Sequence, residues 1–264
     1  MRETAIVTGA SSGIGRATAL YLARSGYDLG LTYNSNEAGA SRTAEDVRAH
    51  GRCVAVRRMQ LDDAEGIESA LSGLTAELGS IAALVNNAGL LSLGPLLEFP
   101  VTEWRRVIDT VLTGTFVVSQ VVARHMVQSG TRGRIVNVSS VHEAVPLMEG
   151  AAYCAAKAGV GMLTKCMALD LAPYGIRVCA VGPGETATPM SGAAEGEDIH
   201  ARRRPELPIG RPGAPEEIAE AIAYLLSPTA RYTTGTTLFV DGGLMLMAAI
   251  GNQRTIMASL KGDA

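Results

Sequence analysis

Residues 4–22 read TAIVTGASSGIGRATALYL and contain three signals that together decide the fold. A short apolar run at 4–9 predicts a buried strand, and an apolar pattern of helical period begins at residue 14. Between them stand Gly9, Gly13 and Gly15, spaced G-x3-G-x-G. Glycines in such a turn let the backbone approach a pyrophosphate, which the free N–H groups at the start of the helix can bind. The stretch therefore predicts a dinucleotide-binding unit of strand, turn and helix.

The rest of the chain repeats this alternation of strand and helix. Further apolar runs predict six more strands, at 28–33, 53–59, 82–88, 133–140, 176–182 and 236–243. Helical patterns fill the gaps at about 14–25, 37–50, 64–79, 103–129, 151–172 and 215–226. Strands that are joined through helices pair in parallel by right-handed crossovers. We expect an α/β fold: a single doubly wound domain of the Rossmann type over residues 1–264, with a seven-stranded parallel sheet and helices on both faces.

Composition excludes several classes of protein. The chain has 264 residues, 47% of them hydrophobic, which is enough for one large core. Its net charge is −3, and the basic residues are scattered apart from the run Arg202 to Arg204, so a nucleic-acid partner is not expected. The sequence shows neither a signal-peptide core nor an apolar run of membrane-spanning length, and its four cysteines lack C-x-x-C pairing. We expect a cytoplasmic protein that does not bind a membrane, and no motif predicts a metal site.

Two segments depart from the alternation. Residues 183–214 are rich in Gly, Pro and Ala and follow the sixth predicted strand. Long loops in compact domains are usually functional, so we expect a substrate lid at about 185–212. The tail 244–264 begins with the apolar run LMLMAAI, which is typical of a segment that packs against a neighbouring subunit. The sequence therefore predicts a homo-oligomer, either a tetramer or a dimer.

The end of the second predicted strand bears on the choice of dinucleotide. NAD sites usually place an acid here to bind the ribose hydroxyls, whereas this chain has Tyr33, followed by Asn34, Ser35 and Asn36. An acid would repel a 2′-phosphate, and the polar side chains present can donate hydrogen bonds to one. We therefore expect NADP(H) to be preferred, with NAD(H) as the alternative. The preference should be modest because no Arg or Lys occupies 33–36.

Five motifs occur in a fixed order along the chain: TGASSGIG (8–15), NNAG (86–89), the serine pair 139–140, YCAAK (153–157) and GPGETATPM (182–190). With them the chain resembles the short-chain dehydrogenase/reductase superfamily from residue 4 to about 245. The segments SSVHE (139–143), VIDTVLTGTF (107–116), GRPGAPEEIA (210–219) and TLFVDGG (237–243) look like the glucose and sugar-alcohol dehydrogenase branch and the related β-ketoacyl carrier-protein reductases.

The resemblance implies three catalytic residues. Tyr153 would be the general acid/base, Lys157 would lower its pKa and bind the nicotinamide ribose, and Ser140 would hydrogen-bond the substrate oxygen. A phenol with a reference pKa of about 10 needs a nearby cation to act as a base near neutral pH. Residues four apart on a helix share a face, so Lys157 can supply that cation. For His142 and Glu143, contact with the substrate pocket and exposure in a loop are equally good interpretations.

The resemblance also implies a cofactor site along one edge of the sheet. Its residues are expected to be Gly9, Ser11, Ser12, Gly13, Ile14, Gly15, Tyr33, Asn34, Ser35, Gln60, Leu61, Asn87, Ala88, Gly89, Tyr153, Lys157, Pro183, Gly184, Thr186 and Thr188.

Three residues depart from the family pattern. Gln60 stands where Asp is common, and Cys179 where Asn is common, and both changes look tolerable. Val111 stands where the family usually has an asparagine that holds a water linking the lysine to solvent. Valine cannot hold a water, so the proton relay must be rerouted or slowed.

These features predict an oxidoreductase that moves a hydride between nicotinamide and a carbonyl or secondary alcohol, such as a sugar or polyol. A β-ketoacyl thioester reductase is an alternative within the enzymes. A dinucleotide-binding sensor or scaffold with little turnover is an alternative from another class, motivated by Val111.

Overall fold

The computed structural model describes residues 3–193, 202–205 and 207–247 and contains one sheet. Its seven strands are all parallel and lie in the order β3-β2-β1-β4-β5-β6-β7. This confirms the predicted single α/β domain with a doubly wound parallel sheet. The strands are β1 (Thr4–Val7), β2 (Asp28–Tyr33), β3 (Val54–Arg58), β4 (Ile81–Asn86), β5 (Arg134–Val138), β6 (Arg177–Pro183) and β7 (Thr237–Val240).

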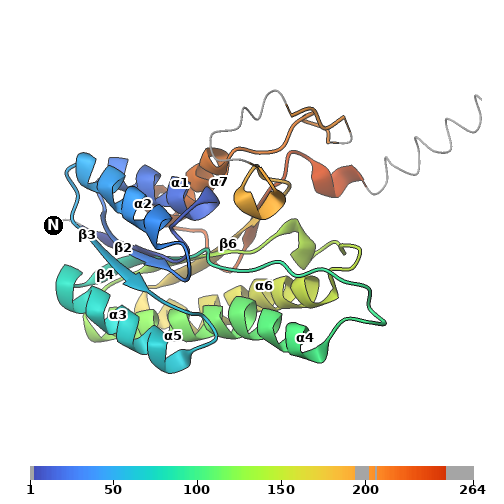
Figure 1. Ribbon diagram of the computed structural model, residues 1–264. Coiled ribbons are helices and arrows are strands. Elements are labelled where there is room, and N and C mark those ends of the chain that lie inside the picture. The colour runs from blue at the N-terminus through green and yellow to red at the C-terminus, as the bar shows by residue number, and fades with distance from the viewer. Residues whose placement is uncertain (1–2, 194–201, 206, 248–264) are drawn as a thin grey trace, which may run out of the picture.

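Helices cover both faces of the sheet (Figure 1). One layer contains α1 (Gly13–Arg24), α2 (Glu37–Ala49) and α7 (Pro215–Leu226), and the other contains α3 (Ala64–Leu78), α4 (Val101–Ile108), α5 (Gly114–Gln128) and α6 (Ala151–Leu171). Alternation along each strand serves both layers: Val7 packs beneath the first layer with Leu29 and Leu31, whereas its neighbour Ile6 packs beneath the second with Leu84. Because both faces of the strands are buried, the strands read as continuous apolar runs in the sequence.

The predicted helix 103–129 is interrupted in the structure. A π-helical turn, Asp109–Thr113, separates α4 from α5. The Thr115 hydroxyl donates to the carbonyl oxygen of Val111 at 2.7 Å within this turn. A side chain at Gly114 would come within 2.6 Å of the Leu61 carbonyl oxygen, so glycine allows α5 to approach the loop after β3 closely. Helical periodicity alone could not reveal the turn, because one inserted residue leaves the apolar pattern nearly intact.

The segment Val101–Gln128 is the one helix of the described residues that is long and apolar enough to cross a membrane, by length and composition. Its buried residues, including Val118, Val122 and Met126, belong to the core that covers the sheet. The segment is therefore a helix of the protein interior.

The strand order places the site. The first three strands are added towards one edge of the sheet and the last four towards the other, so the strand order switches between β1 and β4. Ligands of open α/β sheets bind at the carboxyl ends of the strands beside such a point. The loops after β1, β4, β5 and β6 meet there. The segment that follows β6 is tied back at its base, because the Gly213 amide donates to the Glu185 carbonyl oxygen at 2.9 Å. Part of the predicted lid (194–201 and 206) and most of the predicted tail (248–264) lie outside the described residues.

Candidate active site

The glycine-rich turn after β1 has the backbone conformation that its sequence predicts. Gly9 and Gly13 have φ values of 65° and 51°, a region that favours glycine. A side chain at Gly15 would collide with the carbonyl oxygen of Gly9, so this residue allows the helix to pack closely on the turn. No side chain caps the start of α1 at Ser12, so the first N–H groups of the helix are left for a ligand. The turn therefore fits the pyrophosphate of a dinucleotide.

Residues after β4 hold this turn in place. The Asn87 side-chain amide donates to the carbonyl oxygens of Thr8 and Gly9, at 3.0 and 3.1 Å. The backbone amides of Asn87 and Ala88 both donate to the Thr8 hydroxyl at 3.0 Å. Asn87 thus connects the two strands on either side of the switch point, and it fixes the shape of the surface on which a cofactor would lie.

The carboxyl ends of β2 and β3, where the sequence predicts the adenosine end of the cofactor site, contain a cation that the sequence interpretation missed. Tyr33 at the end of β2 pairs in register with Arg58 at the end of β3, and the Arg58 Nε donates to the Asn34 carbonyl oxygen at 3.0 Å. The Arg58 guanidinium is exposed beside the predicted Asn34 and Ser35. The predicted parallel pairing of strands could have revealed Arg58, because it brings the ends of β2 and β3 together.

An acid lies at the same end. Desolvation raises the pKa of the Tyr33 phenol, and Glu37 in the first turn of α2 raises it further. Arg58 lowers the pKa of the same phenol. Farther along the crevice, Gln60 is exposed and Leu61 is buried. The adenosine end thus presents charges of both signs to solvent.

The two serines after β5 point in different directions, as strand alternation predicts. Ser140 is buried and accepts a hydrogen bond from the His142 amide at 3.1 Å, and its side chain lowers the pKa of Tyr153. Ser139 instead donates to the carbonyl oxygen of Lys157 at 3.3 Å and so anchors α6 against the sheet. The structure brings together Ser140 and Tyr153, as the resemblance implies.

Lys157 lies one turn after Tyr153 on α6, with its Nζ 5.7 Å from the centre of the phenol ring. Its ammonium group donates to the Val138 carbonyl oxygen at 2.7 Å. Burial lowers the pKa of Lys157 to about 8, and the charge of Glu143 opposes this. The ammonium form therefore predominates at neutral pH.

The pKa of Tyr153 corrects one expectation. Burial raises the pKa of the phenol, and the hydrogen bond with Ser140 opposes this only in part. The structure therefore gives a phenol whose pKa is set by burial, whereas the resemblance implies one lowered by Lys157. A phenol in this state is protonated at neutral pH and is prepared to donate its proton.

His142 and Glu143 occupy two different environments. The His142 ring lies edge-on to Tyr153, with a centroid separation of 6.2 Å, and its Nδ1 is 3.1 Å from the Val145 carbonyl oxygen. The Glu143 side chain instead points inward, where its Oε1 accepts from the Thr237 hydroxyl at 2.9 Å. His142 therefore lies beside Tyr153, and Glu143 contacts β7.

Val111 forms an apolar wall next to α6. Its side chain is buried and packs with Ala152, Ala156 and Val160 of that helix. Its γ-carbon lies 3.9 Å from the position that a side chain on Gly89 would occupy. The departure from the family pattern therefore lies inside the site.

The segment after β6 closes the other side of the crevice. Gly184 lies so close to Asp241 that a side chain would come within 2.7 Å of its Cα. The Thr186 hydroxyl donates to the Gly184 carbonyl oxygen at 3.2 Å, and Thr188 lies opposite Gly13, with its methyl carbon 3.2 Å from where a β-carbon there would be. The predicted residues Pro183 to Thr188 thus face the glycine-rich turn, as a nicotinamide-binding segment should.

Comparison with known protein families agrees with this geometry. The model, described as "Enoyl-(Acyl carrier protein) reductase", matches residues 9–245. The oxidoreductase YohF of Escherichia coli (strain K12), itself termed uncharacterized, is 44% identical over 93% of this chain and 97% of its own length. The chain belongs to the short-chain dehydrogenase/reductase superfamily. Another relative, glucose 1-dehydrogenase 2 of Bacillus subtilis (strain 168), is 36% identical over 92% of this chain and 95% of its own length.

Solved structures agree with this assignment. Acetoin dehydrogenase YohF from Salmonella typhimurium aligns with a TM-score of 0.87 and 43% identity, over 94% of this chain and 98% of that one. An actinorhodin polyketide ketoreductase variant, solved with NADPH, aligns with a TM-score of 0.85 and 36% identity over 92% of this chain and 97% of that one. As a member of the superfamily, this short-chain dehydrogenase/reductase is an NAD(P)-dependent enzyme that transfers a hydride between nicotinamide and a carbonyl or secondary alcohol. The alternative of a sensor with little turnover is not supported.

Proposed function

We propose that this enzyme interconverts a small ketone and its secondary alcohol, with Ser140, Tyr153 and Lys157 as the catalytic residues. The observation that carries the proposal is the position of Ser140 beside Tyr153, where its side chain lowers the pKa of the phenol, with Lys157 one helical turn away. A bound nicotinamide cofactor supplies the hydride or accepts it. The chain supplies the proton and orients the substrate, which is the usual division of tasks between a protein and its cofactor.

Each catalytic residue has one task in this proposal. Ser140 donates a hydrogen bond to the carbonyl oxygen and orients it towards Tyr153. The Tyr153 phenol, protonated at neutral pH, gives its proton to that oxygen as the alkoxide forms. The Lys157 ammonium then stabilises the phenolate, because an opposite charge within a few ångströms favours an anion. In alcohol oxidation the same groups act in reverse order.

We also propose that NADP(H) is preferred over NAD(H). Arg58, exposed next to the Asn34 backbone, supplies the cation that residues 33–36 lack, and a guanidinium is well suited to a phosphate. Glu37 on the other side of Tyr33 would repel the same phosphate, so the preference is modest. The NADPH found with the actinorhodin ketoreductase variant supports this proposal.

The experiment is a cofactor and substrate screen. Initial rates are measured with NADPH and with NADH against acetoin, related α-hydroxyketones and diketones, cyclic ketones and a β-ketoacyl thioester, and with NADP⁺ against glucose and polyols. The proposal predicts turnover of a ketone or secondary alcohol with a larger kcat/KM for the phosphorylated cofactor. Turnover confined to the thioester would favour the β-ketoacyl reductase instead.

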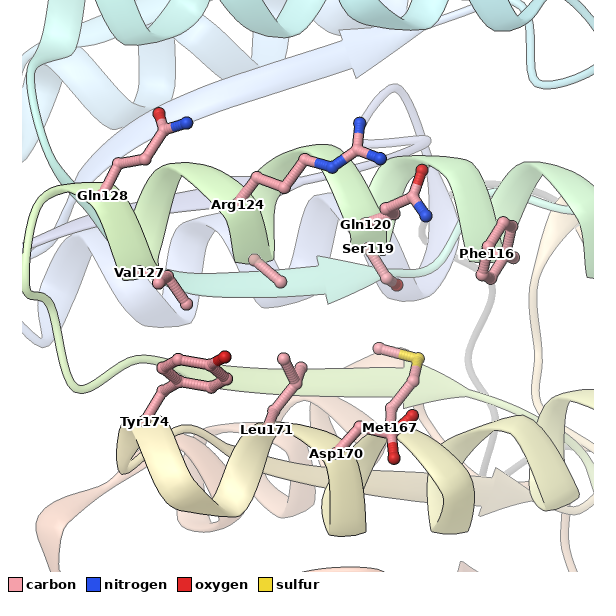
Figure 2. Close-up of a pocket in the computed structure, with 11 residues that line it drawn as sticks. Phe116, Ser119, Gln120, Arg124, Val127, Gln128, Met167, Asp170, Leu171 and Tyr174 are labelled. Atoms are coloured by element: carbon pink, nitrogen blue, oxygen red, sulfur yellow. The ribbon is translucent and has the colours of Figure 1, made fainter.

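A homo-oligomer is proposed from the outer face of α5 and α6. A groove of about 410 Å³ lies between these helices, remote from Tyr153, and is lined largely by apolar atoms (Figure 2). Phe116, Met162, Leu169 and Tyr174 on these helices and the turn after them are exposed, and such a face is stabilised by covering it with a second copy of the chain. Light scattering of the wild type and of Leu169→Glu tests this: we expect a dimer or tetramer whose mass falls in the variant. Free cysteines among the described residues accord with the proposed cytoplasmic location.

A further inference from the structure

The carboxylate of Glu143 is held inside the protein by a specific arrangement. Glu143 ends a short 3-10 turn, Val141–Glu143, that follows Ser140 directly. Its Oε1 accepts from the Thr237 hydroxyl at 2.9 Å, and its Oε2 is buried without a hydrogen-bond partner among the residues that the structure describes. A buried carboxylate oxygen without a donor is costly unless a positive charge compensates for it.

Helix α6 makes room for this carboxylate at Gly161. A side chain there would come within 2.7 Å of the Glu143 carboxyl carbon and of its Oε1. Gly161 lies one turn after Lys157, and Lys157 lies one turn after Tyr153, so the three positions share one face of the helix. The Glu143 carboxylate thus occupies the space that a side chain at Gly161 would fill.

Charged groups on the elements around α6 differ in their effect on Lys157. Besides Glu143, the titratable groups on the elements that pack against α6 are His142 on the 3-10 turn after Ser140, Arg177 and Cys179 on β6, Asp109 on the π-helical turn, Glu103, Arg105 and Arg106 on α4, Arg124 and His125 on α5, and Tyr174 in the turn after α6. Burial raises the pKa of Cys179. On α6 itself stand Tyr153, Cys154, Lys165, Cys166 and Asp170. Asp109 and Arg105 are exposed, and Glu103 pairs with Arg106. Among the residues that the structure describes, Glu143 is the one charge that raises the pKa of Lys157.

We propose that Glu143 is a positioning residue that favours the ammonium form of Lys157, acting through space from the position that Gly161 leaves open. Without this negative charge, burial in the site would shift Lys157 towards its neutral form. A neutral amine cannot stabilise the Tyr153 phenolate and binds the ribose less well. This inference rests on the proposed role of Lys157 in catalysis, but it concerns a residue to which that proposal assigns no task.

The chain allows a direct measurement, because it has three lysines: Lys157, Lys165 and Lys261. Carbon-13 NMR of lysine labelled at Cε reports each titration separately and needs neither substrate nor cofactor. Loss of one signal in Lys157→Met assigns the resonance of interest. In the wild type we expect Lys157 to titrate near pH 8, well below an unperturbed lysine.

Two variants test the proposal. Glu143→Gln removes the charge at nearly constant shape, and we expect the Lys157 midpoint to fall by roughly half a pH unit or more. Gly161→Ala pushes the carboxylate away without removing it, so a smaller shift in the same direction is expected, with no loss of helix propensity. The matched control is Glu149→Gln, which removes a charge from an exposed side chain of the same loop and should leave the midpoint unchanged.

The outcomes separate this inference from the proposed function. A Lys157 midpoint in Glu143→Gln equal to that of the wild type would overturn the inference, even if the variant were less thermostable, because Glu143 would then be only a structural link to Thr237. If Glu143→Gln does not fold, Gly161→Ala provides the same test. If the midpoint falls but the alkaline limb of the kcat/KM profile does not move with it, Glu143 controls Lys157, and the catalytic role of Lys157 in the proposed function is what fails.

Discussion

The two ends of the cofactor crevice are built in different ways. At the nicotinamide end, Ser140 and Lys157 are buried, and Ser140, Tyr153 and Lys157 are fixed by hydrogen bonds or by a helical turn. At the adenosine end, Arg58 and Glu37 are exposed and carry opposite charges on either side of Tyr33. A buried group interacts strongly with its neighbours, whereas solvent screens an exposed one. We therefore expect the buried end to determine the rate and the exposed end to adjust the choice of cofactor by a small free energy.

The largest expected effect comes from the buried end. Tyr153→Phe removes the hydroxyl that transfers the proton, and general acid/base groups contribute about 10²–10⁴-fold to kcat. The ring still packs against α6 and His142, so NADPH affinity should remain within about twofold of wild type. Stopped-flow rates and NADPH fluorescence titrations measure the two quantities. Retention of more than about a third of the wild-type kcat would remove Tyr153 from the mechanism.

A smaller effect is expected at the exposed end. Arg58→Ala should weaken NADPH binding by about fivefold and leave NADH binding unchanged, since an exposed contact between a guanidinium and a phosphate is worth about 1 kcal/mol. Arg57→Ala is the matched control: this neighbouring arginine pairs with Glu77 on α3 at 2.8 Å instead. Equal losses for both cofactors, or an equal loss in the control, would show that Arg58 does not contact the 2′-phosphate.

Placing an acid at the same end sharpens this test. Tyr33→Asp puts a carboxylate at the end of β2, next to Arg58 in the sheet register. The carboxylate should repel the 2′-phosphate and bind the ribose hydroxyls, so the kcat/KM preference should change to NADH. A wild-type enzyme that already prefers NADH would show that repulsion by Glu37 outweighs attraction by Arg58 at this end.

The smallest effect is expected at Val111, where the buried end departs from its family. Val111→Asn introduces an amide beside α6, which should raise kcat by about twofold if it restores a water path to Lys157. It also buries a polar group at a cost of about 1–3 kcal/mol if that group finds no partner, so Tm should fall. An unchanged kcat, with no solvent isotope effect in the wild type, would mean that another route, such as one through Thr110 or Thr113, already carries the proton.

The same contrast explains how much the sequence could predict. The doubly wound parallel sheet and the glycine-rich turn follow from local patterns, because each depends on residues close together in the chain. The roles of Ser140 and Tyr153 were implied by the family resemblance instead. Arg58 could not be recognised from its neighbours in sequence, since its relevance arises from the pairing of β3 with β2. Glu143 was equally ambiguous, because its inward direction depends on contacts with Thr237 and Gly161.

The pKa of Tyr153 marks another limit. The sequence places Lys157 on the same helix face as Tyr153 and so predicts a cation nearby, which is confirmed. It does not reveal that burial would raise the pKa of the phenol. The depth of a side chain is a property of the folded chain as a whole, and the π-helical turn at Val111 was hidden for the same reason.

The central claim is that the two ends of the crevice act independently, one on rate and the other on cofactor choice. The double variant Tyr153→Phe/Arg58→Ala tests it directly when its kcat and NADPH affinity are measured beside both single variants. Distant, independent sites add within about 0.5 kcal/mol, so we predict that the double variant shows the kcat loss of the first change and the affinity loss of the second, each within about twofold. A kcat loss from Arg58→Ala, or an affinity loss from Tyr153→Phe that depends on Arg58, would contradict the account.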